Sequence, residues 1–257
     1  MARFDLTDAE WTIIAPLLPG AEGRKNGRPR PDDRKVINGI FFVLRTGTPW
    51  RDLPERYGPY TTVYNRFNRW AKAGIWLRIF EALAARSPQS LQLIDSSIIR
   101  AHQHAAGGKK GGPDNAIGRS RGGLSTKINA VVDQQGMPVR IVLSQGQSSD
   151  KTIAPTLIEG LKPDRDLVAD RGYDARAIID LVEARGGRAH IPTSRDRKVQ
   201  RSVDHFIYRQ RNLIERFFNK LKHFRRIATR YDKTARNFLA AILLAATRLW
   251  ARFESTT

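Results

Sequence analysis

The first 88 residues carry apolar positions at helical spacing. Thr7 and Glu10 form a capping-box pattern at the start of a helix whose apolar residues recur until Pro19 ends it. A second helix is predicted over residues 32–45 and a third over 61–72. These segments predict a small all-α domain over residues 1–88.

Residues 48–72 have the pattern of a helix-turn-helix-like segment. A short helix over 52–57 is followed by a Gly-Pro turn and the helix over 61–72, whose inward face carries Val63, Phe67 and Trp70. Arg66 and Arg69 are then expected on its outer faces, where arginine can read base edges or bind phosphates. The alternative is an ordinary helical hairpin with a solvated charged face. We favour DNA contact.

The hydrophobic periodicity changes at residue 91. Short strand-like runs appear over 91–99, 127–133, 139–144, 167–170 and 188–192, with helical patterns over 152–161 and 175–185. A hairpin turn at 134–138 makes the first three strands an antiparallel meander, and the later alternation of helix and strand implies parallel additions. This is the layout of the ribonuclease H-like fold. We therefore expect an α/β catalytic domain, a mixed sheet flanked by helices, over residues 89–257.

A strongly amphipathic helix follows. On a helix of about 100° per residue, four polar side chains fall within roughly 60° of arc: Tyr208, Arg211, Glu215 and Lys222. The apolar residues between them occupy the remaining, mostly opposite side. One carboxylate among cations can take part in binding a metal ion and a phosphate together.

Two further carboxylates lie in strand-like runs. Asp95 is within the first strand and Asp170 closes the fourth, so with Glu215 they suggest a site for Mg²⁺ or Mn²⁺. Two such ions can activate the attacking oxygen and stabilise the leaving one in phosphodiester chemistry. An aspartate at a strand end is more often a turn or cap residue. Asp174 is the rival to Asp170 but is expected to cap the following helix, and Asp133 is expected to be structural.

Composition supports a polyanionic partner. The formal charge is +20, and Lys and Arg release counterions when they meet phosphates. A ribosomal or chromatin-like packing protein is the alternative. The absence of cysteine excludes disulfides and thiolate zinc sites. The apolar run at 238–250 is too short to cross a membrane, and no signal peptide is apparent, so we expect a soluble cytoplasmic protein with no membrane partner.

Basic side chains gather around the expected site. Residues 195–236 contain 14 Lys or Arg against four Asp or Glu, which we interpret as a DNA track rather than a solvated face. Residues 107–123 hold seven glycines with several cations, and they lack the ending of a nucleotide-binding P-loop. His102 and His104 lack a third soft ligand, so DNA contact is favoured over metal binding. Besides the polar face of the 208–222 helix, we expect DNA contacts from His102, Arg119, Arg121, Lys127, Arg171, Arg225, Arg226 and Arg230.

Several motifs point to one family. The spacing Tyr208-x2-Arg211-x3-Glu215-x6-Lys222 resembles the Y-R-E-K signature of DDE transposases of bacterial insertion sequences, in the IS four/five superfamily. Further stretches resemble its IS five-like branch: LRTGTPWRDLPERY at 44–57, DSSIIRAH at 95–102, GRSRGGL at 118–124, ADRGYD at 169–174 and FRRIATRYD at 224–232. The resemblance covers nearly the whole chain.

The resemblance implies a catalytic triad of Asp95, Asp170 and Glu215, Mg²⁺ or Mn²⁺ dependence, and binding of double-stranded DNA at terminal inverted repeats. It also implies a homodimer or higher synaptic assembly in a bacterial, nucleoid-associated setting. Tyr208, Arg211 and Lys222 would bind the DNA end. The 45 residues from Asp170 to Glu215 leave no room for the large β-insertion of some longer relatives. The alternatives are a DNA-binding regulator or a nuclease that does not perform strand transfer.

Overall fold

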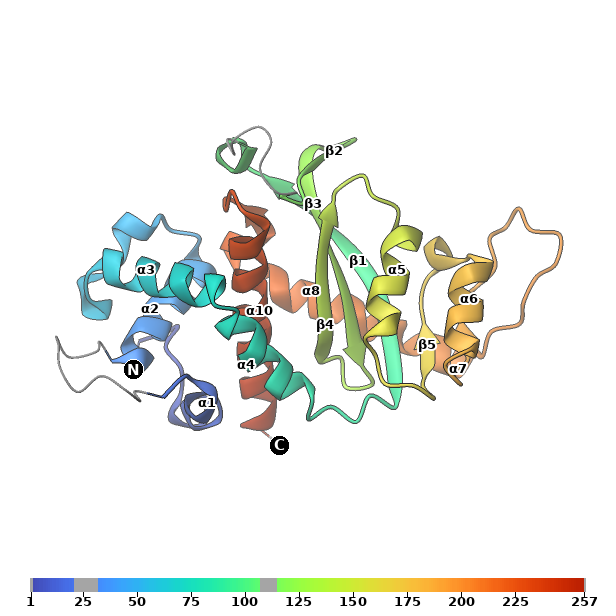
Figure 1. Cartoon of the computed structure of the whole chain (residues 1–257), viewed down its shortest axis with the longest axis horizontal. Helices are drawn as coiled ribbons and strands as arrows, with labels where there is room; N and C mark the ends of the chain where they lie inside the picture. Colours follow the sequence, from blue (N-terminus) through green and yellow to red (C-terminus); the bar gives the residue numbers. More distant parts are fainter. Residues whose placement is uncertain (1, 21–31, 107–114, 257) are drawn as a thin grey trace.

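The computed structural model describes residues 2–20, 32–106 and 115–256. A layer of helices lies beside a mixed sheet, and the long C-terminal helix α10 (Ala235–Glu254) stands between them (Figure 1). Residues 21–31 and the glycine-rich residues 107–114 lie outside the described part of the chain.

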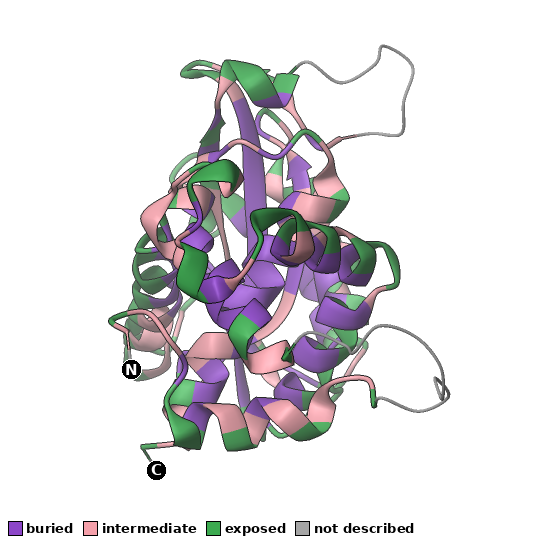
Figure 2. Ribbon diagram, turned by 90° about the vertical axis from the view of Figure 1, so that its left-hand side faces the viewer, coloured by how far each residue is buried: buried purple, intermediate pink, exposed green. Residues whose placement is uncertain are grey.

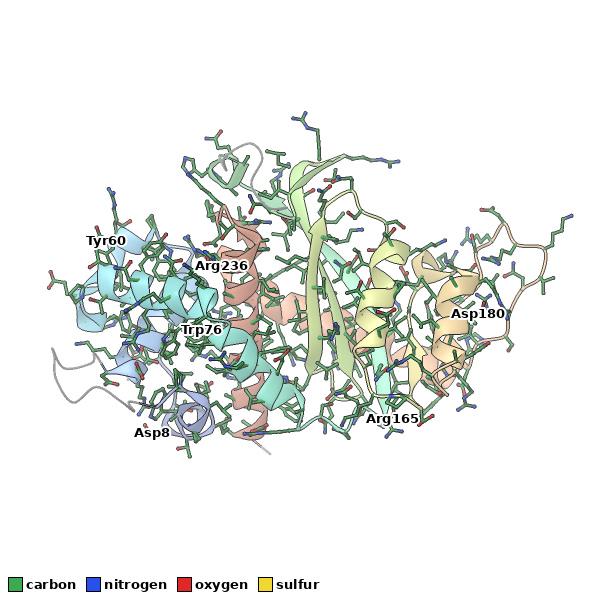
Figure 3. All side chains as sticks on the ribbon, viewed as in Figure 1. Asp8, Tyr60, Trp76, Arg165, Asp180 and Arg236 are labelled. Atoms are coloured by element: carbon green, nitrogen blue, oxygen red, sulfur yellow. The ribbon has the colours of Figure 1, made fainter. Side chains whose placement is uncertain are left out.

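The helical layer is built by α1 (Asp8–Ile14), α2 (Asp33–Thr46), α3 (Tyr60–Lys72) and α4 (Ile75–Ala84), with a 3-10 turn at Ala15–Leu17. The capping box at the start of α1 is confirmed. The Glu10 amide donates to the Thr7 hydroxyl over 3.0 Å, and the Thr7 amide donates to the Glu10 carboxylate over 2.9 Å. In Figure 3 Trp76 lies within this layer and Tyr60 at its outer edge.

The helix expected over residues 52–57 is wrong. This segment forms two 3-10 turns, Trp50–Asp52 and Glu55–Tyr57, before α3 begins. A proline precedes each turn, at Pro49 and Pro54, and the residue before a proline is driven out of the helical region. The segment therefore lacks the first α-helix of a helix-turn-helix.

The sheet has seven strands: β1 (Leu91–Ala101), β2 (Gly118–Ser120), β3 (Gly123–Asp133), β4 (Pro138–Gln145), β5 (Asp166–Val168), β6 (Ala189–His190) and β7 (Thr229–Arg230). The three long strands β1, β3 and β4 form the predicted antiparallel meander, and β5 and β6 add in parallel on the other edge of β1. The short β2 and β7 were not predicted, because two or three residues carry no readable alternation.

Helices cover both faces of the sheet. On one face α5 (Asp150–Glu159) and α6 (Arg176–Glu183) enclose a core with Ile94, Val131 and Leu167. On the other face lie α8 (Asn212–Lys222) and α10. Three short elements surround α8: α7 (His205–Tyr208), a 3-10 turn at Arg209–Arg211 and α9 (Arg225–Ala228).

Helix α10 joins the two halves of the chain. It packs against α1 and α4 on one side and β4 on the other, and its middle is buried (Figure 2). Arg248 donates to the backbone oxygens of Phe4 (2.5 Å) and Asp5 (2.8 Å), while the Trp250 indole donates to Pro138 (2.8 Å). One apolar core therefore runs from Leu6 through α10 to the sheet.

The β3–β4 turn shows Asp133 in the structural role expected of it. Its carboxylate accepts from the amides of Gln135 and Met137, each over 2.9 Å, and Gly136 adopts the left-handed conformation with a φ of 74°. Among the described residues, no helix is long and apolar enough to cross a membrane, and this holds for α10 too.

Candidate active site

The strand register brings Asp95 and Asp170 together. In the parallel pairing of β1 with β5, Leu93 lies opposite Val168. Asp95 and Asp170 each follow two residues later, where β5 has ended and the edge of β1 is open. The carboxyl ends of parallel strands lie at the same edge of a sheet, so the two carboxylates lie side by side.

Asp95 is a largely buried carboxylate. Its side chain is 19 % exposed and accepts the amide hydrogen of Ser96 over 2.7 Å. Burial, with a smaller effect from the charge of Asp170, raises the pKa of Asp95 to about 6, although the Ser96 amide and Arg211 act in the opposite direction. A nearby cation would therefore stabilise its charged form.

Asp170 begins a 3-10 turn over Arg171–Tyr173. Its carboxylate accepts the amide hydrogen of Gly172 over 2.8 Å, which fixes its orientation at the exit of β5. A Cβ at Gly172 would meet the same carboxylate oxygen at 2.8 Å, so glycine makes room for Asp170.

Helix α8 supplies Glu215 from the opposite direction. Ile214, Phe217 and Leu221 bury the inner face of the helix against the core, which leaves Glu215 half-exposed on the outer face. This is the division of faces that the sequence predicted, but the expected single helix over 208–222 is divided, with Tyr208 in α7 and Arg211 in the 3-10 turn before α8.

Arg211 connects α8 to β1. Its guanidinium forms an ion pair with Glu215, four residues later, and its Nη1 atom lies 3.5 Å from the Oδ2 atom of Asp95. Within the described residues, no three carboxylate or imidazole groups lie close enough together to form a ready metal-ligand cluster. The cation between Asp95 and Glu215 is Arg211.

The chemistry of the donors nevertheless fits a divalent ion. The three side chains offer hard carboxylate oxygens, the ligands that Mg²⁺ and Mn²⁺ prefer. The buried environment of Asp95 disfavours its charged form, and a bound cation would stabilise that form. We therefore propose Asp95, Asp170 and Glu215 as the residues that would hold the metal.

Tyr173 is a neighbour that the sequence reasoning did not single out. It is buried beside this site, with the side chain of Ser96 near its hydroxyl. Burial raises the pKa of Tyr173, and the charges of Asp150, Asp95 and Asp170 raise it further. The signal available was its place within the ADRGYD stretch at 169–174.

Three of the expected DNA-contact residues, Arg66, Lys127 and Arg230, have buried side chains that are paired within the protein. Arg66 forms an ion pair with Asp33 and lies over the ring of Trp70. A cation committed to an interior carboxylate is not available to a phosphate. The helical period of α3 gave no sign of this, since Asp33 belongs to another helix.

Lys127 and Arg230 are the other two. Lys127 donates to the Asp150 carboxylate (2.9 Å) and the Ser148 backbone oxygen (2.8 Å). Arg230 is fully buried and donates to the backbone oxygen of Asp232 (2.9 Å) and to the Thr126 hydroxyl. Both cations hold loops in place instead of facing solvent.

The remaining expected contacts are at least partly accessible. The exposed cations are Arg69 on α3, Arg119 and Arg121 around β2, Arg171 beside Asp170, Lys222 at the end of α8, and Arg225 on α9. Tyr208 and His102 are half-buried, and Arg226 is only 11 % exposed, with its guanidinium over the ring of Trp50. His102 accepts the His104 amide at Nδ1 and packs against Tyr231.

Asp174 does not cap a helix as expected. Its buried carboxylate pairs with Arg197 (2.9 Å) and Arg201 (2.5 Å) and accepts the Ser194 amide (2.8 Å). Helix α6 begins after Ala175 without a side-chain cap. Asp174 instead fixes the segment that leads from β6 toward α7.

Comparison with known families agrees with this architecture. Residues 6–80 match the family described as "Putative transposase of IS4/5 family", and residues 86–250 match the family described as "Transposase DDE domain". The second match covers most of the chain and contains all three carboxylates.

Shorter relatives match part of the chain. A "Putative transposase for insertion sequence element IS6501" of Brucella ovis is 37 % identical over 130 residues, which are 50 % of this chain and 100 % of the relative. An uncharacterised protein, y4sN, of Sinorhizobium fredii is 40 % identical over 105 residues, which are 41 % of this chain and 83 % of that protein.

One solved structure supports the fold. The piggyBac transposase, in a synaptic complex with hairpin DNA, superposes with a TM-score of 0.50 at 10 % identity, over 96 % of this chain and 71 % of that one. At this identity the likeness concerns the fold alone, and it agrees with the predicted ribonuclease H-like sheet. With its sheet order, its carboxylate placement and its family matches, the chain belongs to the DDE transposases of the IS4/5 group.

Proposed function

We propose that this protein binds the terminal inverted repeats of its own insertion sequence, hydrolyses the phosphodiester at each element end, and joins the freed 3′-OH to target DNA. The observation that carries the proposal is the arrangement at one open sheet edge, where Asp170 at the exit of β5 lies beside Asp95 of β1, and Arg211 links Asp95 to Glu215 of α8. Such a set holds divalent ions for phosphodiester chemistry.

Asp95, Asp170 and Glu215 would each hold metal from a fixed position. Two Mg²⁺ or Mn²⁺ ions, when bound, would supply an activated nucleophile and neutralise charge on the leaving oxygen. Asp95 and Asp170 are fixed by backbone amides, so their oxygens are already oriented for ligation. Glu215 sits on a helix whose buried face fixes its position.

DNA would approach along the exposed cations near these carboxylates. Arg171 lies beside Asp170, and Lys222 ends the helix that carries Glu215. Phosphate contacts of this kind position a duplex without reading its sequence. Arg119, Arg121, Arg225 and Arg69 extend the basic surface to β2, α9 and α3.

We further propose that two copies act together, one for each element end, in the cytoplasm of a bacterium. Joining both ends to one target requires two active sites held in a fixed relation. Size measurement of the protein with and without end duplexes tests this assembly, and a monomer on paired ends would contradict it.

The first test combines purified protein, labelled duplexes of the element ends, supercoiled target and Mg²⁺ or Mn²⁺. Glu215→Gln should retain end binding and lose cleavage by at least about 100-fold, as expected when an electrostatic group of the transition state is removed. Cleavage without joined product would indicate a nuclease. Binding without cleavage by the unaltered protein under either metal would indicate a regulator.

A further inference from the structure

Arg211 occupies the space between the carboxylates. Its guanidinium is ion-paired with Glu215 and lies 3.5 Å from Asp95 through the other nitrogen. Within the described part of the chain, these two carboxylates are its side-chain partners. It belongs to the 3-10 turn that enters α8, so the backbone holds it at the site.

A guanidinium and a divalent ion compete for the same oxygens. Mg²⁺ and Mn²⁺ need direct bonds to carboxylate oxygens at about 2.0–2.2 Å, which leaves no place for a guanidinium on those atoms. Because Arg211 stays charged at every relevant pH, it cannot leave by losing its proton. The side chain has to move.

The surroundings of Arg211 allow that movement. The side chain of Arg211 is 26 % exposed and that of Glu215 is 50 % exposed, so solvent reaches the ion pair and Arg211 can rotate toward it. A phosphate is an equally good bidentate partner for a guanidinium. The exposed Arg171, Arg209 and Arg216 give the same face a positive potential that attracts DNA.

We propose that Arg211 is an internal cation that holds Asp95 and Glu215 in the DNA-free protein, and that a phosphate of the DNA end draws it away so that metal can bind. DNA binding then precedes metal loading. This inference rests on the proposed function, because it takes Asp95, Asp170 and Glu215 as the metal ligands.

Such an order has a chemical consequence. The protein without an end duplex carries Arg211 on the carboxylates that would hold the metal, so it is not prepared to hydrolyse DNA that it meets in passing. Arg211 is here a positioning residue, and its predicted effect concerns metal affinity before any reaction occurs.

Metal binding to the full chain tests the proposal. Mn²⁺ would be titrated into the protein, with free Mn²⁺ counted by electron paramagnetic resonance, in the absence and presence of a pre-cleaved end duplex that offers no bond to hydrolyse. Wild type should bind Mn²⁺ roughly tenfold more tightly with DNA than without. This factor corresponds to the free energy needed to displace one partly exposed ion pair. Arg211→Gln should bind it tightly without DNA, with little further gain from the duplex.

Arg209→Gln is the matched control, since it removes an exposed arginine two residues away. It should keep the wild-type dependence on DNA. Equal Mn²⁺ affinity of wild type and Arg211→Gln without DNA would overturn the proposal. Circular dichroism of each variant confirms that it is folded.

A double variant separates this inference from the function beneath it. If Asp95→Asn in the Arg211→Gln background abolishes Mn²⁺ binding, the carboxylates are the metal site whatever Arg211 does. If the double variant binds Mn²⁺ as well as Arg211→Gln, the metal lies elsewhere and the proposed function fails at its site.

Discussion

At the scale of the residue, the buried charge of Asp95 lowers the stability of the metal-free protein. A buried carboxylate with a pKa near 6 favours its protonated form, and the carboxylate that a metal needs is the disfavoured one. The cost remains in the metal-free protein because Arg211 offsets only part of it. Active-site residues commonly reduce the stability of the folded protein in this way.

Replacing Asp95 by Asn should therefore stabilise the metal-free protein at neutral pH. Between the ordinary pKa of 3.8 and about 6 the folded state binds more protons than the unfolded state, so the free energy of unfolding falls as pH rises through this window. Above pH 6 Asp95→Asn should be more stable by up to roughly 3 kcal/mol, and the difference should vanish below pH 4.

Urea unfolding at several pH values measures this difference. Asp180→Asn is the matched control: Asp180 lies on the outer face of α6, half-exposed and paired with Arg176 (Figure 3). Its effect should be small at every pH. A less stable Asp95→Asn at pH 7.5 would contradict the account.

Gly172 offers a second residue-scale prediction. In Gly172→Ala the new methyl group meets the Asp170 carboxylate at 2.8 Å, and the short side chain has to turn away. We expect Mn²⁺ affinity and cleavage to fall about tenfold or more while stability changes by less than about 1 kcal/mol. Gly122→Ala is the control, because the nearest atom to its Cβ is 3.9 Å away. Unchanged metal affinity in Gly172→Ala would count against this role.

At the scale of the element, the segment from β6 to α7 is held by one buried carboxylate. Asp174 ties Arg197, Arg201 and the Ser194 amide together, and Asp204 then caps α7. The segment has no regular structure of its own between Ser194 and Asp204. Its shape therefore depends on Asp174.

Asp174→Ala should release this segment without unfolding the core. We expect a loss of about 2 kcal/mol, since three hydrogen-bonded contacts go but both arginines can reach water. Trypsin should then cleave between residues 194 and 203 at least several times faster. Asp196→Ala, an exposed change in the same segment, should leave the cleavage rate unaltered. Equal rates for both variants would argue that Asp174 does not hold the segment.

The same scale shows what the sequence could and could not predict. The capping box of α1, the meander and the two faces of α8 depend on local spacing, and all three are confirmed. The burial of Arg66, Lys127 and Arg230 depends on partners distant in sequence, such as Asp33 and Asp150. Helical or strand periodicity does not indicate such pairings, so charge alone did not predict that these side chains are buried.

At the scale of the whole molecule, the boundary near residue 88 separates two family matches but not two cores. Residues 6–80 and 86–250 match different families, yet α10 from the second packs against α1 and α4 from the first. We propose 1–88 and 89–257 as functional domains. Their folding is coupled through the shared core.

Residues 89–257 alone should therefore fail to unfold cooperatively. Without the helical layer, the apolar side of α10 that packs against α1 and α4 meets water. We expect aggregation on size exclusion and no sharp thermal transition, whereas co-expression with residues 1–88 should restore a single soluble species. A sharp transition of the isolated piece near that of the full chain would show two independent cores.

The position of α10 in the chain also affects folding during synthesis. Ribosomes build the helical layer and the sheet first, and the helix that fills the seam between them emerges last among the described elements. A nascent chain therefore keeps an open apolar seam until α10 has been synthesised. Prematurely terminated products should be cleared by proteases instead of accumulating as DNA-binding fragments, so the cell receives whole enzyme or none.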